Sequence, residues 1–207
     1  MNTNRGFDLL SPVYDVLARV VFGRSIVESQ TKFLSCIPDN SKILILGGGT
    51  GWLLEAIEEK NRSGEIWYVE CSAGMINKAR NRKLTNTIHF IQGTEEDIPP
   101  RKFDVVITNF YLDLFTERKL KEVVVQINQH TNPTSQWLIT DFADTGTAWQ
   151  QWMLTIMYAF FRIVCSIEGK RLPDWPACLR HGGWMQSNVA YRYGKFIVSS
   201  TWNKTLK

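Results

Sequence analysis

Short apolar runs alternate with stretches of helical periodicity through the first two thirds of this sequence. The runs are four to six residues long and rich in β-branched and aromatic residues, which is typical of buried strands. We expect strands at residues 43–46, 66–69, 88–91, 103–108 and 137–140. Strands that alternate with helices predict an α/β fold with a doubly wound, mostly parallel sheet and helices on both faces.

The stretches between these runs repeat their apolar residues on one helical face. One helix is expected at 52–60, and Ser72 and Thr116 have side chains suited to cap the start of the next two helices. Before the fifth strand, Asn132 and Pro133 predict a turn. The inward positions of the two capped helices are expected to be Met75, Ile76 and Ala79, and Leu120, Val123, Val124 and Ile127.

Residues 149–164 carry an unbroken apolar stripe, and most of this stripe is expected to pack on the sheet. The rear of the same helix is also apolar, and around Tyr158 it is a candidate wall for a substrate pocket. Two further strands, at 186–193 and 195–203, are expected to form an antiparallel hairpin joined near Gly194. The stripe consists of Trp149, Trp152, Met153, Ile156, Met157, Phe160, Phe161 and Val164.

Composition and charge narrow the class of protein. With 207 residues, 44% of them hydrophobic, the chain can bury the core of a single domain. The net charge of +4 comes from scattered Lys and Arg without an aromatic and basic stripe, which disfavours a nucleic-acid partner. The longest apolar stretch, 152–167, is interrupted by Arg162 and is too short to span a bilayer. The N-terminus has no apolar core of signal-peptide length.

The cysteines argue against a metal centre. Cys36, Cys71, Cys165 and Cys178 lie far apart and form no C-x-x-C pair, so neither a metal site nor a disulfide framework is expected. Free thiols are typical of a reducing cytoplasm, and we expect a cytoplasmic location. The carboxylates of Asp141 and Asp144 lack the signal of a third ligand.

The sequence KILILGGGTGWLL, at 42–54, combines a strand, a glycine turn and the start of a helix. Such a turn lets the backbone approach a ligand closely, beside the unpaired N–H groups of the helix start. The spacing is G-x-G-x-G, and Trp52 stands where the dinucleotide fingerprint requires its third glycine, which disfavours NAD. Glu70 ends the second strand, 19 positions after Gly51, and can accept hydrogen bonds from both hydroxyls of a ribose.

Five successive segments resemble the motifs of class I S-adenosylmethionine-dependent methyltransferases. They are KILILGGGTGWLLE, YVECSAGMINKAR, IHFIQGTEEDIP, FDVVITNFYLDLF and WLITDF. The beginning FDLLSPVYDVLARVVFG is similar to the N-terminal motif of the menaquinone/ubiquinone methyltransferase group. The resemblance covers about residues 7–141. It implies a Rossmann-like sheet of seven strands whose last two form the reversed hairpin.

The resemblance also implies a cofactor, S-adenosylmethionine, and the residues that bind it. The glycine loop would hold the methionine part, and Glu70 the ribose. Met75 would pack near the adenine, Asn109 would lie near the donor methyl group, and Tyr14 would close over the cofactor. The expected cofactor-binding residues are Tyr14, Gly47, Gly48, Gly49, Gly51, Glu70, Cys71, Met75, Thr94, Glu95 and Asn109.

Two positions depart from the family pattern. Ile45 stands where the family has an acidic residue that orients the loop, and Thr94 replaces a carboxylate in the loop that contacts the adenine.

Within one domain, the expected parts are an N-terminal helical lid or flank (1–40), including a helix start at Ser11 and Pro12 and a helix at 25–35. The other expected parts are a cofactor-binding core (41–142), a helical substrate-side segment (147–183) and a C-terminal strand pair (184–207).

Methyl transfer from a sulfonium is an in-line displacement that depends mainly on positioning, so no catalytic triad is expected and none is found. A general base is needed only if the acceptor must lose a proton. We expect a small, apolar or aromatic acceptor. The alternatives are a protein that binds the cofactor without catalysis, and contact of the apolar helix with a membrane surface. Candidates for a base or an orienting residue are Tyr14, Tyr111, Asp113, Asp141, Tyr158 and His181.

Overall fold

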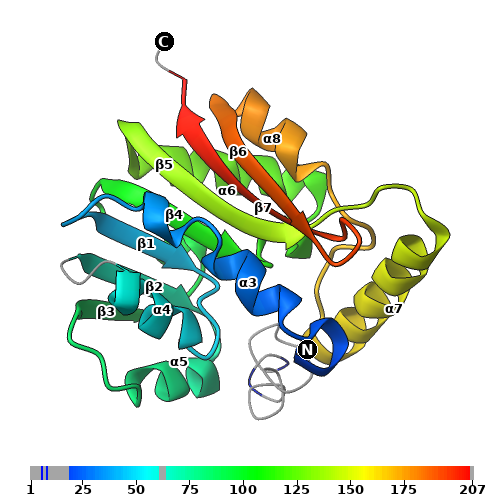
Figure 1. The fold of residues 1–207 in the computed structure, drawn as a ribbon, viewed down its shortest axis with the longest axis horizontal. Coiled ribbons are helices and arrows are strands. Elements are labelled where there is room, and N and C mark those ends of the chain that lie inside the picture. Colours follow the sequence, from blue (N-terminus) through cyan, green and yellow to red (C-terminus); the bar gives the residue numbers. More distant parts are fainter. Residues whose placement is uncertain (1–5, 7, 9–18, 61–63, 206–207) are drawn as a thin grey trace.

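The computed structural model describes residues 6, 8, 19–60 and 64–205 of the chain. Seven strands form one sheet in the order β3-β2-β1-β4-β5-β7-β6 (Figure 1). The first five run parallel, and β7 pairs antiparallel with both β5 and β6. The predicted fold class is confirmed. The strands are β1 (Lys42–Leu46), β2 (Glu65–Glu70), β3 (Thr87–Gln92), β4 (Phe103–Asn109), β5 (Thr131–Phe142), β6 (Trp184–Arg192) and β7 (Ile197–Lys204).

The sheet separates two apolar cores, because successive side chains of a strand point to opposite faces. In β1, Ile43 and Ile45 pack into one core, whereas Leu44 and Leu46 pack into the other. All four side chains are buried, as expected for a strand covered on both faces. This is why β1 reads as an unbroken apolar run.

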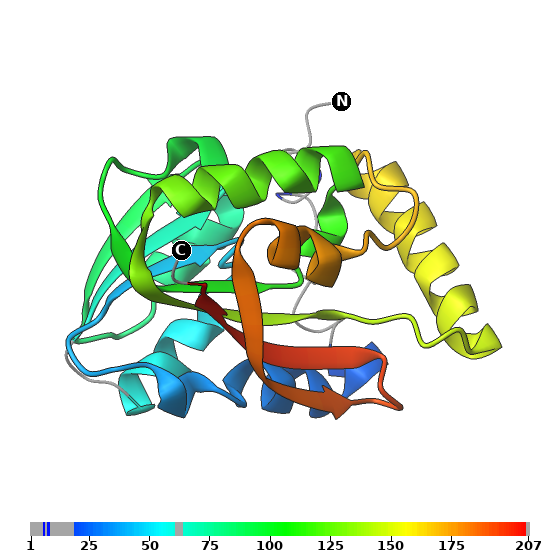
Figure 2. The ribbon, with the colours of Figure 1, turned by 90° about the horizontal axis from the view of Figure 1, so that it is seen from above.

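Helices cover both faces of the sheet. Figure 2 shows α6 and α8 on one face and α3 and α4 on the other. The helices are α3 (Ser25–Thr31), α4 (Trp52–Lys60), α5 (Ala73–Arg80), α6 (Glu117–Gln129), α7 (Ala148–Cys165) and α8 (Trp175–His181). Three short 3₁₀ helices are η1 (Leu34–Cys36), η2 (Glu95–Asp97) and η3 (Leu112–Leu114). None of the described helices is long and apolar enough to cross a membrane.

Both predicted helix caps are confirmed. The Ser72 hydroxyl accepts a hydrogen bond from the Met75 N–H at 3.2 Å, and the Thr116 hydroxyl accepts one from the Lys119 N–H at 3.3 Å. Each bond satisfies a backbone donor that the first turn of a helix leaves unpaired. The inward positions predicted for α5 and α6 are all buried.

The turn predicted at Asn132 and Pro133 is wrong, because β5 already begins at Thr131. The register between β4 and β5 shifts between Phe103 and Val105, and such an irregularity tolerates a proline in a strand. The helix predicted at 25–35 is also shorter than expected and continues as η1. The predicted start at Ser11 and Pro12 lies outside the described residues.

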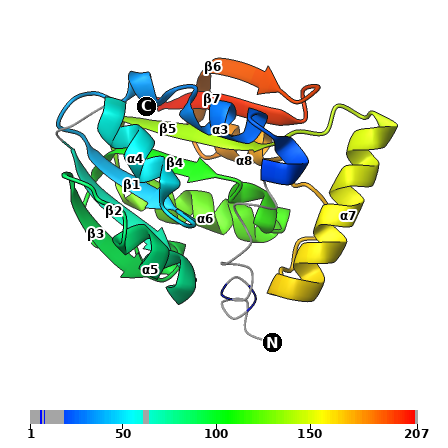
Figure 3. The same cartoon turned by 60° about the horizontal axis from the view of Figure 1, so that its bottom comes forward.

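The orientation predicted for the long apolar helix is only partly right. Met153, Met157, Phe160, Phe161 and Val164 of the predicted stripe are half-buried against the core, whereas Trp152 and Ile156 of the same stripe are exposed. Of the predicted rear face, Leu154 and Tyr158 are buried and Ile163 is exposed. Figure 3 shows α7 at one end of the molecule, apart from the helices that cover the sheet. The helix is apolar on both sides, so its periodicity could not distinguish the covered side from the open one.

Candidate functional site

The glycine loop at the end of β1 is held open by two side chains of β2. The Tyr68 hydroxyl donates to the Gly49 carbonyl at 2.6 Å, and the Gly49 N–H donates to Glu70 Oε2 at 2.9 Å. Gly49 has φ +67°, a conformation that other residues rarely adopt, and no atom lies within 4 Å of where its Cβ would be. A methyl group at Gly48, by contrast, would overlap the Tyr68 ring. The loop therefore presents open space above Gly49.

Glu70 links the loop to the start of α5. Its carboxylate is buried, and Oε1 accepts a hydrogen bond from the Ser72 N–H at 2.8 Å. Oε1 also accepts from the Cys71 thiol at 3.4 Å, whereas Oε2, which accepts from the Gly49 N–H, keeps a second lone pair for a ligand hydroxyl. Burial, together with the charge of Glu70, raises the pKa of the neighbouring Cys71 thiol. Cys71 therefore stays protonated and is no nucleophile.

A further group of contacts, the Tyr111–Glu95–Lys119 anchor, joins the loop after β3 to the loop after β4. Glu95 is buried in η2 and accepts a hydrogen bond from the Tyr111 hydroxyl at 2.9 Å. Lys119, on α6, forms an ion pair with Glu95 at 3.3 Å. Burial and the charge of Glu95 raise the pKa of Tyr111 well above its ordinary value. Tyr111 is thus a positioning residue, whose ring also packs 2.6 Å from where a Cβ of Gly47 would lie.

These loops surround a cavity of about 660 Å³ at the carboxyl ends of β1, β2 and β4. This is where open α/β sheets bind ligands, and the volume suits a small-molecule site. Nine of the predicted cofactor-binding residues line it: Gly47, Gly48, Gly49, Glu70, Cys71, Met75, Thr94, Glu95 and Asn109. Gly51 does not line the cavity, because it packs against Ala79 of α5. Tyr14 lies outside the described residues.

Tyr111, a candidate base or orienting residue, also lines the cavity, but most of the remaining lining was not predicted as part of the site. Trp52 and Leu53 at the start of α4, Gln30 of α3, and residues 166–168 after α7 all face the cavity. The sequence carries no local signal for 166–168, since only the course of α7 brings them there. Further apolar lining comes from Phe110, Leu114 and Phe115.

Three of the candidate bases cluster behind the cavity wall. Asp141 is buried at the end of β5, where its Oδ2 accepts from the N–H groups of Leu112 and Asp113 at 3.0 and 3.3 Å. The Tyr158 hydroxyl donates to the Asp113 carbonyl at 2.8 Å. Burial raises the pKa of Asp113 to about 7 and that of Asp141 well above its ordinary value. None of these three side chains lines the cavity.

The other features of the site concern Thr94, His181 and the rear face of α7. Thr94 caps η2, where its hydroxyl accepts from the Glu96 N–H at 3.3 Å. The imidazole of His181 contacts the Ala177 carbonyl within α8 and lies outside the cavity. Leu154 and Tyr158 line a second cavity, of about 850 Å³, between α7 and α8. Among the described residues, no group of three His, Cys, Asp or Glu could hold a metal ion.

Comparison with known proteins identifies the fold. Residues 43–134 match the model of a family described as a methyltransferase domain. A chain from the complex between the Haloferax volcanii Trm112 methyltransferase activator and the putative methyltransferase is similar, with a TM-score of 0.73 and 12% identity. The similarity covers 100% of this chain and 99% of that one. No curated protein matches the sequence.

Two further solved structures support the same conclusion. The complex of DhpI with SAH has a TM-score of 0.71 and 16% identity, over 99% of this chain and 97% of that one. The mitomycin 7-O-methyltransferase MmcR has a TM-score of 0.71 and 15% identity, over 96% of this chain and 60% of that one. The chain therefore has the Rossmann-like methyltransferase fold. The segment that matches the family model, 43–134, runs from β1 to the start of β5 and carries the glycine loop and Glu70.

Proposed function

We propose that this protein binds S-adenosylmethionine and transfers its methyl group to a small, apolar or aromatic acceptor. The observation that carries the proposal is the cavity above Gly49, bordered by the Glu70 carboxylate. The match of 43–134 to a methyltransferase domain and the neighbouring structures bound to SAM or SAH support it. The menaquinone/ubiquinone-like group and a cytoplasmic location remain finer predictions.

The residues of the cavity fit the cofactor. A side chain at Gly49 would fill the space nearest the loop, and the remaining lone pair of Glu70 Oε2 suits a ribose hydroxyl. Met75 is buried and lines the cavity beside them, where it can pack on an adenine ring. Ile45 lines the cavity without offering a hydrogen bond, so the loop depends on Tyr68 and Glu70 for its position.

Apolar side chains supply part of the cavity wall: Trp52, Leu53, Phe110, Leu114 and Ile167. Charged side chains, those of Glu96, Arg118, Lys119, Glu122 and Glu168, also line the cavity. We propose that the acceptor lies against the apolar part. Such walls exclude water and favour a planar or aliphatic acceptor over a charged one.

The cofactor supplies an activated methyl group and a good leaving group. The contribution of the protein is then to bring an acceptor atom into line with that methyl group in a dry site. No His lines the cavity among the described residues, and Tyr111 is committed to Glu95. We therefore propose transfer to an acceptor atom that needs no strong general base.

Calorimetry and a transfer assay test the two halves of the proposal separately. Titration with S-adenosylmethionine and with S-adenosylhomocysteine should show binding of both, whereas NAD should not bind. Incubation with radiolabelled S-adenosylmethionine and a panel of quinols, phenols and amines should then label an apolar or aromatic member. Absence of cofactor binding at millimolar concentration would refute the proposal.

A second candidate is cofactor binding without catalysis, as a sensor or scaffold. The observation in its favour is Ile45, which replaces the acidic residue that supports the cofactor in the family that the sequence resembles. This candidate predicts clear binding of the cofactor and no labelled product with any acceptor. Replacing Ile45 by Asp would then increase cofactor affinity without producing transfer.

A further inference from the structure

The outer face of α7 is an apolar surface without a partner among the described residues. Of the nine large hydrophobic residues that are exposed in the described part of the chain, four lie on this helix: Trp149, Trp152, Ile156 and Ile163. Trp152 is 65% exposed and Ile163 is 78% exposed. Contiguous exposure of this kind marks a binding surface rather than ordinary surface composition.

The exposed residues share one side of the helix. Trp152, Ile156, Ala159 and Ile163 are separated by four, three and four positions, which places them on one line along α7, the outer face. The opposite side packs into the protein through Leu154, Tyr158 and Cys165. The outer face therefore contributes nothing to the core that the structure describes.

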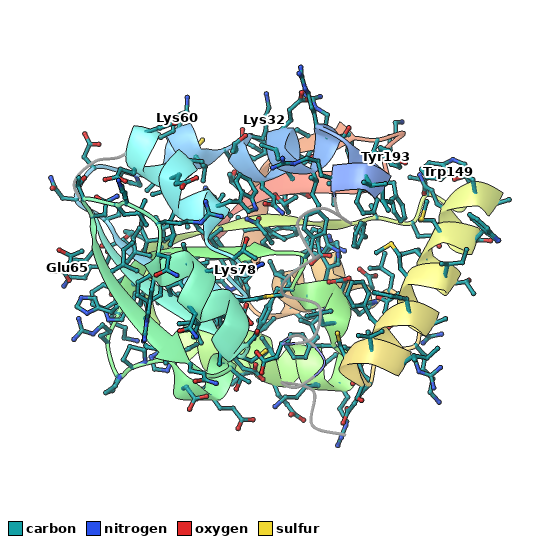
Figure 4. All side chains as sticks on the ribbon, turned by 90° about the horizontal axis from the view of Figure 1, so that it is seen from below. Lys32, Lys60, Glu65, Lys78, Trp149 and Tyr193 are labelled. Atoms are coloured by element: carbon teal, nitrogen blue, oxygen red, sulfur yellow. The ribbon has the colours of Figure 1, made fainter. Side chains whose placement is uncertain are left out.

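The surroundings of the outer face are cationic. At the start of α7, the Trp149 ring contacts the Tyr193 ring, and the Tyr193 hydroxyl donates to the Val21 carbonyl at 3.0 Å (Figure 4). The segments 19–24 and 192–195 thus meet this end of the helix. Together with 145–167 they contain no Asp or Glu, and the nearest carboxylates along the chain, Asp144 and Glu168, lie just beyond the two ends of this segment. Their cations are Arg19, Arg24, Arg162, Arg192 and Lys195, of which Arg192 pairs with Glu28.

The helix that carries the outer face also leads directly into the lining of the cavity. Ser166, Ile167 and Glu168 follow α7 directly, and all three line the cavity. Ser166 ends the helix with φ +55°, which turns the chain sharply from α7 toward the cavity. A surface that binds α7 would therefore lie close in sequence to the 166–168 segment that lines the cavity.

We propose that the outer face of α7 docks on an anionic membrane surface. Trp and aliphatic side chains enter the boundary of head groups and acyl chains, and flanking Arg and Lys pair with anionic lipids. A protein partner, by contrast, would need both an apolar face and acidic residues placed opposite these Arg and Lys side chains. Docking itself is independent of the proposed function, whereas delivery of an apolar acceptor from the membrane rests on it.

Vesicle co-sedimentation tests the proposal with the full chain and no cofactor. We expect binding to vesicles of phosphatidylcholine mixed with phosphatidylglycerol, weaker binding to pure phosphatidylcholine, and a decrease with added salt. Trp152→Ser combined with Ile163→Ser should lower the partition coefficient at least roughly tenfold, because both side chains would leave the membrane. Arg162→Gln combined with Lys195→Gln should lower binding to the anionic vesicles only.

Val125→Ser combined with Met185→Ser is the matched control. These residues are 56% and 63% exposed on α6 and β6, so the same number of exposed apolar side chains is removed elsewhere. The control should bind vesicles like the parent protein. Equal binding by the α7 variant, or no binding by the parent, would overturn the proposal. So would a dimer, seen by analytical ultracentrifugation, that the α7 substitutions dissociate. Vesicle binding by a protein that fails to bind S-adenosylmethionine would support docking and refute the proposed function instead.

Discussion

The buried carboxyl pair of Asp113 and Asp141 should make the stability of the protein fall as the pH rises toward 8. Both side chains are almost fully buried, and Asp113 Oδ1 has no hydrogen-bond partner. Two negative charges at this position would repel each other without the solvation of water. The folded protein therefore retains a proton on the pair that the unfolded chain releases.

The expected magnitude follows from the pKa of Asp113, which burial raises from 3.8 to about 7. Because the folded state binds more protons than the unfolded state between these values, the free energy of unfolding decreases with pH. The full loss is roughly 4 kcal/mol well above pH 7, and more than half of it falls between about pH 5 and pH 8.

Asp113→Asn should reduce this dependence, because the amide keeps the shape, needs no proton and removes the negative charge beside Asp141, whose own pKa burial still raises. Urea unfolding from about pH 5 to pH 8 should show a smaller slope for the variant than for the parent. The variant should be more stable by about 2–3 kcal/mol at the upper end. Asp39→Asn removes an exposed carboxylate and serves as the control for net charge.

Asp141→Asn should behave in the opposite way. The two Asp141 oxygens accept from three backbone N–H groups, those of Leu112, Asp113 and Phe142. An amide turns one of these oxygens into a donor and leaves an N–H unpaired, which costs about 1–3 kcal/mol at every pH. Equal pH slopes for the parent and Asp113→Asn would refute the idea of a retained proton.

Three further predictions concern the cavity. Glu70→Ala should weaken S-adenosylmethionine binding by about 1–3 kcal/mol in calorimetry, while Glu65→Ala, at the exposed end of the same strand, should not; equal affinities would place the ribose elsewhere. Tyr111→Phe should lower the unfolding free energy by about 1–3 kcal/mol, because buried Glu95 loses a donor, and an unchanged melting temperature would contradict this role. Gly48→Ala should destabilise the fold by about 1–3 kcal/mol through overlap with Tyr68. Gly49→Ala should cost only about 1 kcal/mol and act mainly on cofactor affinity, so similar stability losses would show that both glycines serve packing alone.

The features that sequence could predict are those encoded within a few neighbouring residues. The glycine loop, the Glu70 strand end and the caps at Ser72 and Thr116 depend on local spacing, and the structure has each of these elements at the expected place. The Tyr111–Glu95–Lys119 anchor joins three separate elements, so no local sequence pattern predicts it.

The prediction of which side of α7 is buried was only partly right, for a different reason. Hydrophobic periodicity identifies a side of a helix only when the other side is polar. On α7 both sides are apolar, and the few polar residues, such as Gln151 and Thr155, face the second cavity. Tertiary packing alone decides that Leu154 and Tyr158 are covered while Trp152 is not.

The double attachment of Gly49 to β2 has a consequence for engineering. Tyr68 and Glu70 are two positions apart, so they reach the loop from the same side of one strand. Their reach depends on the pairing of β1 with β2, in which Ile45 lies opposite Tyr68. A slip of one residue would offer the loop Trp67 and Val69 instead, which carry no carboxylate and no hydroxyl. The loop therefore cannot be grafted onto another protein or redesigned by itself. Strand β2, which holds it, has to be transferred or redesigned together with it.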